Sequence, residues 1–349
     1  MAVELAPWLE TLENTIDLDW EREKFERWRR VLDFQPVDGA FRVAATAAGG
    51  REPGDWPRVS VNQAIADPAL MLLQQLRPVY EAACRRSHAA LNIRCNYGTG
   101  ILPSLFGAEL FWMDEQLDTL PTTRPLEGED AIDRLLDSGV PPLENGLGGR
   151  VFETAEFFME ALAPYPGIRE AVWLYHPDLQ GPIDVVELLW GSGMYYAFYE
   201  EPEKLKALTA LVTETYIRFL RRWLELVKPR AGGEYMAHWG CFFKGQVMLR
   251  DDTVVNLSPE MYAEFVRPHD ERILEEFGAG AIHFCGKADH LVELMTASPR
   301  LTALNLSQPE LNDMRKVYRA TVERGIVLNC PWREEALAGL DLSRGVVLD

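Results

Sequence analysis

Short β-branched or apolar runs alternate with long amphipathic segments through most of this chain, and this alternation limits its possible folds more than any other feature. The runs lie at 41–46, 90–97, 171–179, 233–241, 246–252, 281–286, 301–308 and 325–330. Between most of them, apolar residues recur at helical spacing. Strands that alternate with helices form a parallel sheet, and eight of them can close a (β/α)8 TIM-like barrel. We expect such an α/β barrel, with an open doubly wound sheet as the alternative.

The expected barrel fills most of the chain as a single domain over residues 1–349. Residues 1–36 read as an N-terminal helical extension, because charged residues alternate there with apolar residues at helical spacing. Residues 108–170, after the second expected strand, are more than one βα connection needs and should fold over the barrel mouth. They contain a hairpin-like segment followed by two expected helices. No repeat or flexible linker indicates a second domain.

The charge of the chain narrows the classes of partner. Lys and Arg number 35 against 54 Asp and Glu, which gives a net charge of −19. Phosphate backbones and anionic lipids repel such a chain, so we expect no nucleic acid and no membrane as partners. The N-terminus lacks the pattern of a signal peptide, which predicts a cytoplasmic protein. Five scattered cysteines indicate reduced thiols rather than a disulfide framework.

One histidine and two cysteines stand at matching ends of expected strands. His283 and Cys285 are two residues apart, so their side chains point to the same side of a strand. Cys330 ends the last expected strand, and the carboxyl ends of barrel strands surround one mouth. An imidazole and two thiolates form a zinc set of the catalytic type, with a fourth position for water or substrate. The alternative is a satisfied core histidine beside apolar thiols.

Acidic residues on the fourth and fifth expected strands are candidates for acid–base work. Glu234 and His238 are four residues apart and would share one face; either could be a fourth metal ligand. Asp251 and Asp252 close the fifth strand, one facing inward and one outward. We expect Asp252, Glu234 and His238 to be catalytic. The alternative for one of the two aspartates is capping of the following helix.

Four further residues are expected to bind substrate. Asn96 and Tyr97 precede a turn with two glycines, through which backbone can approach a ligand. Asp178 and Gln180 lie where a strand runs into a helix. The chain has no nucleophile elbow, Walker lysine or dinucleotide fingerprint, which makes nucleotide chemistry improbable.

Residues 90–331 resemble the uroporphyrinogen decarboxylase superfamily, which includes cobalamin-dependent methyltransferases of the methylcobalamin:coenzyme M type. The resemblance rests on NYGTGILPSLFGAEL, on DLQGPIDVVELLWGSGMYYAFYEEPEKLKALTALVTETYIRFL, on DDTVVNLSPEMYAEFVRPHDERI, and on HFCG followed by LTALNLSQPE. It implies a TIM-like barrel with its site in the mouth. His283 and Cys285 match the H-x-C of the zinc methyltransferases. Cys330 departs from that pattern, because the last cysteine of the family typically falls beyond the eighth strand.

The resemblance implies two competing chemistries. The first is zinc-dependent transfer of a methyl group between a corrinoid and a thiol, with methylcobalamin carried by a separate corrinoid protein. The second is metal-free decarboxylation of a porphyrinogen or related carboxylate. The arginine-rich segment of true decarboxylases is absent, since the chain reads AATAAGGREPGDWPR at that place. We therefore expect a methyltransferase first and a carboxy-lyase second.

The sequence also allows further hypotheses about the function, the oligomeric state and the charge of the substrate. Because the match to either motif set is incomplete, a non-catalytic binding subunit is a second alternative. Peripheral aromatic residues and the habit of the superfamily favour a homodimer slightly. The expected mouth holds several acids and no arginine cluster, so a neutral or cationic substrate, or a metal-bound thiol, is expected there.

Overall fold

The computed structural model describes residues 4–349, so the first three residues of the expected extension lie outside the described part. The main helices are α1 (Ala6–Glu13), α2 (Leu18–Leu32), α3 (Val61–Ala66), α4 (Pro68–Arg85), α5 (Ile101–Leu105), α6 (Ala131–Ser138), α7 (Gly148–Leu162), α8 (Pro166–Ala171), α9 (Pro182–Trp190), α10 (Gly193–Glu200), α11 (Pro202–Leu226), α12 (Pro259–Met261), α13 (Arg267–Glu276), α14 (Val292–Met295), α15 (Met314–Ala320) and α16 (Glu334–Leu337). The strands are β1 (Phe41–Arg42), β2 (Asn92–Ile93), β3 (Leu110–Phe111), β4 (Thr122–Thr123), β5 (Trp173–Leu174), β6 (Tyr235–His238), β7 (Cys241–Lys244), β8 (Val247–Arg250), β9 (Gly280–Phe284), β10 (Leu301–Leu306), β11 (Val327–Cys330) and β12 (Val346–Leu348).

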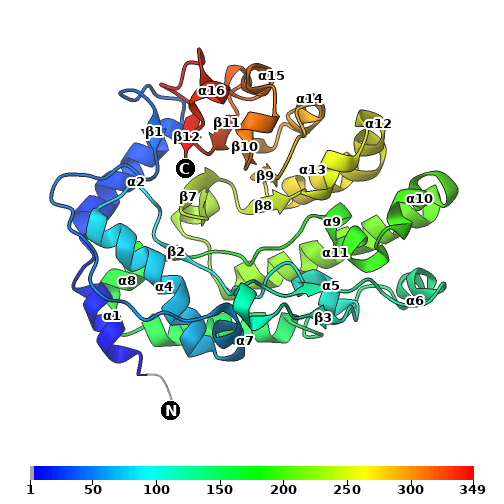
Figure 1. Cartoon of the computed structure of the whole chain (residues 1–349), viewed down its shortest axis with the longest axis horizontal. Coiled ribbons are helices and arrows are strands. Elements are labelled where there is room, and N and C mark those ends of the chain that lie inside the picture. The colour runs from blue at the N-terminus through cyan, green and yellow to red at the C-terminus, as the bar shows by residue number, and fades with distance from the viewer. Residues whose placement is uncertain (1–3) are drawn as a thin grey trace.

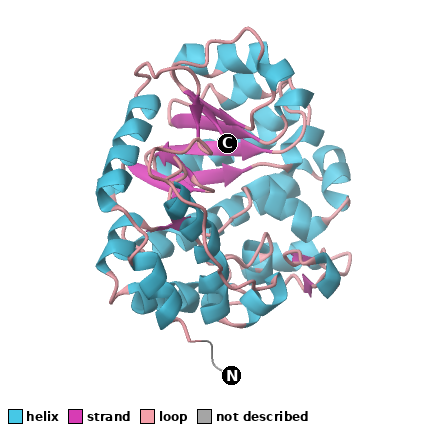
Figure 2. Cartoon of the chain, turned by 60° about the vertical axis from the view of Figure 1, so that its left-hand side comes forward, coloured by secondary structure: helices cyan, strands magenta, loops and turns pink. Residues whose placement is uncertain are grey.

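Six strands form one parallel sheet in the order β1-β12-β11-β10-β9-β8 (Figure 1). A separate parallel pair joins β2 to β5. Helices lie outside these strands (Figure 2). α11 begins with Pro202 in its first turn, and α12 begins at Pro259 with the Ser258 hydroxyl as its cap.

The mixed α/β arrangement is consistent with a TIM-like fold, but strand ladders do not close a ring among residues 4–349. Where β5 would meet β8, the two are linked by single hydrogen bonds. Met248 N–H donates to His176 Nε2 at 3.1 Å, and Gly181 N–H donates to Arg250 O at 2.8 Å. Near β1 and β2, one isolated antiparallel bridge pairs Thr46 with Ser87.

The fourth expected strand occupies a different place from the one predicted. Residues 235–238 form β6, which pairs with β7 as an antiparallel hairpin instead of joining the parallel sheet. The sheet gains β12 in compensation, so residues 325–330 are not the last strand. The run from Tyr235 to Phe243 is almost wholly apolar because the hairpin is buried in the interior. The same pattern would also fit a strand of the parallel sheet that is buried on both faces.

The hairpin packs in the interior of the molecule, against the inner face of the six-stranded sheet. Its side chains share one buried core with those of β1, β8, β9, β10, β11 and β12. Trp28 of α2 joins this inner core, and its indole N–H donates to His88 O at 2.7 Å. A larger outer core lies between the strands and the surrounding helices. Strand residues therefore alternate between an inner and an outer core.

The expected elements after the second strand are present. β3 and β4 form a short antiparallel pair, and α6 and α7 coincide with the two helices predicted from the sequence. α7 packs against α4, α5 and α11. None of the helices within residues 4–349 combines the length and apolar character that crossing a membrane requires.

Candidate metal centre and its surroundings

The inner face of the sheet becomes polar toward the carboxyl ends of its strands. Met248, Ala281, Ala303 and Val327 belong to the inner core, and every second residue after them points the same way. The polar residues at these positions are Arg250, Asp252, His283, Cys285, Asn305, Ser307 and Asn329.

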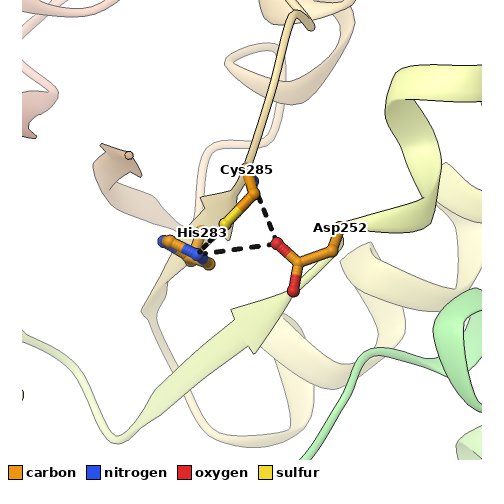
Figure 3. A group of neighbouring side chains, drawn as sticks. All are labelled: Asp252, His283 and Cys285. Carbon is orange, nitrogen blue, oxygen red and sulfur yellow. Dashed lines mark hydrogen bonds and ion pairs between the residues drawn. The ribbon is translucent and has the colours of Figure 1, made fainter. Parts of the chain in front are cut away.

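Asp252, His283 and Cys285 form a compact group at this end (Figure 3). Asp252 follows β8, His283 lies in the neighbouring β9 and Cys285 follows it, so pairing of the two strands brings the three side chains together. His283 Nε2 lies 3.4 Å from Cys285 Sγ and 3.6 Å from Asp252 Oδ1. The backbone N–H of Cys285 donates to the same Oδ1 at 2.9 Å.

The spacing of the three side chains fits a zinc ion. Tetrahedral zinc, with bonds of about 2.0–2.3 Å, holds its ligand atoms about 3.3–3.8 Å apart. The Nε2–Sγ distance of 3.4 Å and the Nε2–Oδ1 distance of 3.6 Å fall in this range. Within residues 4–349, no other three His, Cys, Asp or Glu side chains come within 4.8 Å of one another. Three protein ligands would leave a fourth position for a substrate.

A chain of amide side chains fixes the tautomer of His283. His283 Nδ1–H donates to Asn305 Oδ1, and the Asn305 amide donates in turn to Asn329 Oδ1. Asn329 then donates to Val347 O at 3.3 Å. With Nδ1 protonated, the lone pair of Nε2 faces Cys285 and Asp252. Burial lowers the pKa of His283, and the nearby Asp252 opposes this by raising it. The effect of burial is the larger, so the ring favours the neutral form that a metal requires.

The backbone of Asp252 is hydrogen-bonded to the buried carboxyl group of Asp184. Asp184 of α9 accepts the backbone N–H of Asp252 at 2.9 Å and that of Thr253 at 2.8 Å. Gln180 Nε2 donates to Asp252 Oδ2 at 3.4 Å and to Asp184 at 3.2 Å. Burial, followed by repulsion from Asp252, raises the pKa of Asp184 to about 7. These contacts leave Asp252 Oδ1 directed at His283 and Cys285.

Cys330 does not join this group, and Asp252 takes the place expected for it. Val327 faces the inner core, so three residues later Cys330 faces the outer core, where it is fully buried with Leu328 and Leu348. Burial raises the pKa of this thiol to about 12. Cys285 is half-buried instead, and burial raises the pKa of its thiol as well.

Asp178 lies at the centre of an ionic cluster beside the candidate metal site. Its Oδ2 is 3.3 Å from Arg94 Nη2 and 3.3 Å from Arg250 Nη1, while its Oδ1 is 3.8 Å from His238 Nε2. The expectation of no arginine cluster in the mouth is therefore wrong. Arg94 stands two residues before Asn96 on the same strand face, a spacing from which the sequence could have indicated it.

The ring of Trp239 lies between this ionic cluster and the candidate metal site and contacts residues of both. Its ring centroid is 4.8 Å from that of His283 and 4.4 Å from that of His238, and the Arg250 guanidinium lies 5.0 Å from its centroid. Its φ of +48° is rare for a bulky residue and belongs to the tight turn between β6 and β7, next to the site. Sequence reasoning did not single out Trp239.

Of the remaining residues that were expected to bind substrate or to be catalytic, some lie close to the candidate metal site and others lie far from it. Asn96 Oδ1 accepts from Arg94 Nε at 3.1 Å, so Asn96 adjoins the ionic cluster. Tyr97 lies in the outer core, where its hydroxyl pairs with Thr154 Oγ1 at 2.7 Å. Glu234 is exposed before β6, at the opposite end of that strand from His238. The structure therefore does not place Glu234 or Tyr97 at the metal site.

Similarity to known proteins is found at the level of the fold. No family model matches the chain. No curated protein matches it either. A solved structure of a methyltransferase from Methanosarcina mazei is similar, with a TM-score of 0.62 and 16% sequence identity over 91% of this chain and 90% of that one. At this identity the likeness shows a shared fold, and the resemblance to the uroporphyrinogen decarboxylase superfamily stays a prediction.

Proposed function

We propose that this protein is a zinc-dependent methyltransferase that moves a methyl group between a corrinoid and a thiol. The observation that carries the proposal is the spacing of His283 Nε2, Cys285 Sγ and Asp252 Oδ1, which suits three ligands of one tetrahedral ion. The fold shared with a methyltransferase supports the same class of reaction. The corrinoid would come from a separate partner protein.

The residues around the group have distinct tasks in this scheme. Zinc bound there would lower the pKa of a thiol substrate and so favour its thiolate. Asn305 holds the Nδ1 proton of His283, which keeps Nε2 free as a ligand. Asp184 fixes the backbone from which Asp252 projects. The Asp252 side chain is 29% exposed, so the group can be reached from solvent.

Metal content and methyl transfer together test the proposal. Protein purified without chelator should hold about one zinc per chain and should demethylate methylcobalamin in the presence of a suitable thiol, which changes the visible spectrum of the corrinoid. His283→Ala should lose both properties. His290→Ala, whose ring contacts Leu257 O at 2.9 Å outside the group, should keep both. Absence of zinc from the wild type after supplementation, or zinc retained by His283→Ala, would overturn the proposal.

Arg94 and Arg250 favour a second candidate, a metal-free carboxy-lyase. Both guanidinium groups lie 3.3 Å from Asp178 in the interior, and two arginines at such a place suit a substrate carboxylate. Asp252 would then stabilise a protonated intermediate. Release of CO2 from uroporphyrinogen by chelator-treated protein, unaffected by Cys285→Ser, would favour this candidate over methyl transfer.

A further inference from the structure

A separate apolar cavity lies near the amino ends of β5 and β6, lined by none of the three candidate metal ligands. It measures about 600 Å³ and lies between β5, β6, α7 and the end of α11. The absence of a ladder between β5 and β8 leaves this part of the wall open. Its size falls within the range of pockets that hold small organic molecules.

The walls of this cavity are apolar. Leu162, Leu174, Trp223, Val227 and Met236 are among the side chains that line it. At its inner end His176 accepts the Met248 N–H through Nε2 at 3.1 Å, and burial lowers its pKa, so the ring there is neutral. An apolar body can therefore enter without leaving an ionised group unpaired.

Three cations also line the cavity, and no Asp or Glu does: Arg169, Lys228 and Arg230. Arg230 is anchored, since Nη1 donates to Glu170 O at 2.9 Å and its guanidinium lies 5.3 Å from the Trp173 ring centroid. Arg169 and Lys228 have no carboxylate within 4.0 Å in residues 4–349. Glu170 acts on Arg230, whereas Arg169 and Lys228 are exposed at the edge of the cavity and are complementary to an anion in a chain with a net charge of −19.

We propose that this cavity binds a small amphipathic carboxylate, with an acyl or aromatic body between β5 and α11 and its anionic group at Arg169 and Lys228. The apolar walls supply affinity through buried area, and the cations select the anion over a neutral analogue. The cavity is distinct from the candidate metal centre, because none of the three candidate ligands lines it.

Calorimetric titration of the full chain with dodecanoate, dodecanol and acetate tests this assignment. Dodecanoate should bind with a stoichiometry of about one per chain, dodecanol at least about five-fold more weakly, and acetate not measurably. Lys228→Glu should weaken dodecanoate about five-fold and leave dodecanol unchanged. Arg319→Glu, an exposed arginine outside the cavity, is the matched control and should bind like the wild type.

Two further variants make the result decisive. Ala163→Trp adds bulk at an exposed position of the cavity lining and should weaken dodecanoate and dodecanol alike. His283→Ala should bind dodecanoate as the wild type does. Undetectable binding of dodecanoate, equal affinities for dodecanoate and dodecanol, or no effect of Lys228→Glu would each overturn the proposal.

Discussion

The side-chain oxygen of Asn305 accepts the Nδ1–H of His283 from the neighbouring strand β10. The register places Asn305 directly opposite His283, and Asn329 of β11 directly opposite Asn305. Three strands in register thus hold one imidazole in a single tautomer. The orientation of the candidate ligand is a property of the sheet, not of the loops that follow it.

Replacing Asn305 should weaken zinc binding without removing a ligand. In Asn305→Ala the ring of His283 loses the acceptor for its Nδ1–H, and such outer partners typically contribute 10- to 100-fold to metal affinity, so a loss of about this size is expected. Competition with a chromophoric chelator measures it. Asn256→Ala, which removes an exposed amide that donates to Tyr195 at 3.2 Å, should bind zinc normally. An unchanged affinity in Asn305→Ala would contradict the role assigned to this bond.

Serine replacements of two cysteines should have opposite effects. Cys285→Ser removes a half-buried ligand, so zinc content should fall while the free energy of unfolding of the metal-free chain changes little. Cys330→Ser places a hydroxyl in the outer core, where Cys330 is fully buried, and should cost about 1–3 kcal/mol of stability with zinc retained. Urea unfolding with chelator and metal analysis without it distinguish the two. Loss of zinc in Cys330→Ser would restore that cysteine as a ligand.

The buried carboxyl of Asp270 should make stability fall with pH. Burial, and to a lesser degree the Asp184 carboxylate, raises the pKa of Asp270, and burial raises that of the neighbouring Asp251, above the value of about 3.9 in an unfolded chain. Between these values the folded chain keeps a proton that the unfolded chain releases. The stability contribution of this buried pair is therefore complete below pH of about 4 and falls as the pH rises above the pKa of the unfolded chain.

Asp270→Asn should reduce this dependence, because an amide does not titrate and only Asp251 of the pair can still hold a proton. Urea unfolding between pH 5 and 7 measures the slope for the wild type and the variant. Asp55→Asn, at an exposed position, should leave the wild-type slope unchanged. If the stability of the wild type and of Asp270→Asn changed with pH by the same amount over this range, Asp270 would not hold the proton.

Alanine substitutions at two glycines with positive φ should distinguish the cost of an unfavourable backbone conformation from the cost of a steric clash. Gly245 has φ +99°, and a Cβ there would lie 2.3 Å from Ala279 O; Gly278 has φ +81° and no atom within 4 Å of that position. Gly278→Ala should therefore cost about 1–2 kcal/mol from conformation alone. Gly245→Ala should cost about 1–3 kcal/mol more, because the backbone at Gly245 and Ala279, just before β8 and β9, must shift. Equal losses in urea unfolding would contradict this reading of the contact.

The sequence predicted the alternation of strands and helices, because a 3.6-residue apolar period marks each long helix. It misplaced residues 233–241, because burial on all sides gives a hairpin in the interior the same continuous apolar pattern as a parallel wall strand. The turn of that hairpin, Trp239-Gly240, also lacks the Asn-Gly or Asp-Gly pair that marks tight hairpins. β12 is only three residues long, which is too short for a periodic signal.

The site was predicted in part for a similar reason. The i, i+2 spacing of His283 and Cys285 placed them together, since a strand fixes that relation locally. Cys330 was assigned to the wrong face, because both faces of β11 are buried and an apolar run does not show which residues point inward. The contribution of Asp252 depends on the pairing of β8 with β9 and on Asp184, which no local pattern reveals.

The interior hairpin has a consequence for the order in which the chain folds. β6 and β7 are joined by a tight turn, and isolated hairpins close within about 1–10 μs. The sheet around them depends on pairs far apart in sequence, above all β1 with β12, which join Phe41 and Arg42 to Val347 and Leu348 and require slow loop closure. We expect the centre of the molecule to become ordered first and to serve as the nucleus around which the outer sheet assembles, with β1 and β12 pairing last.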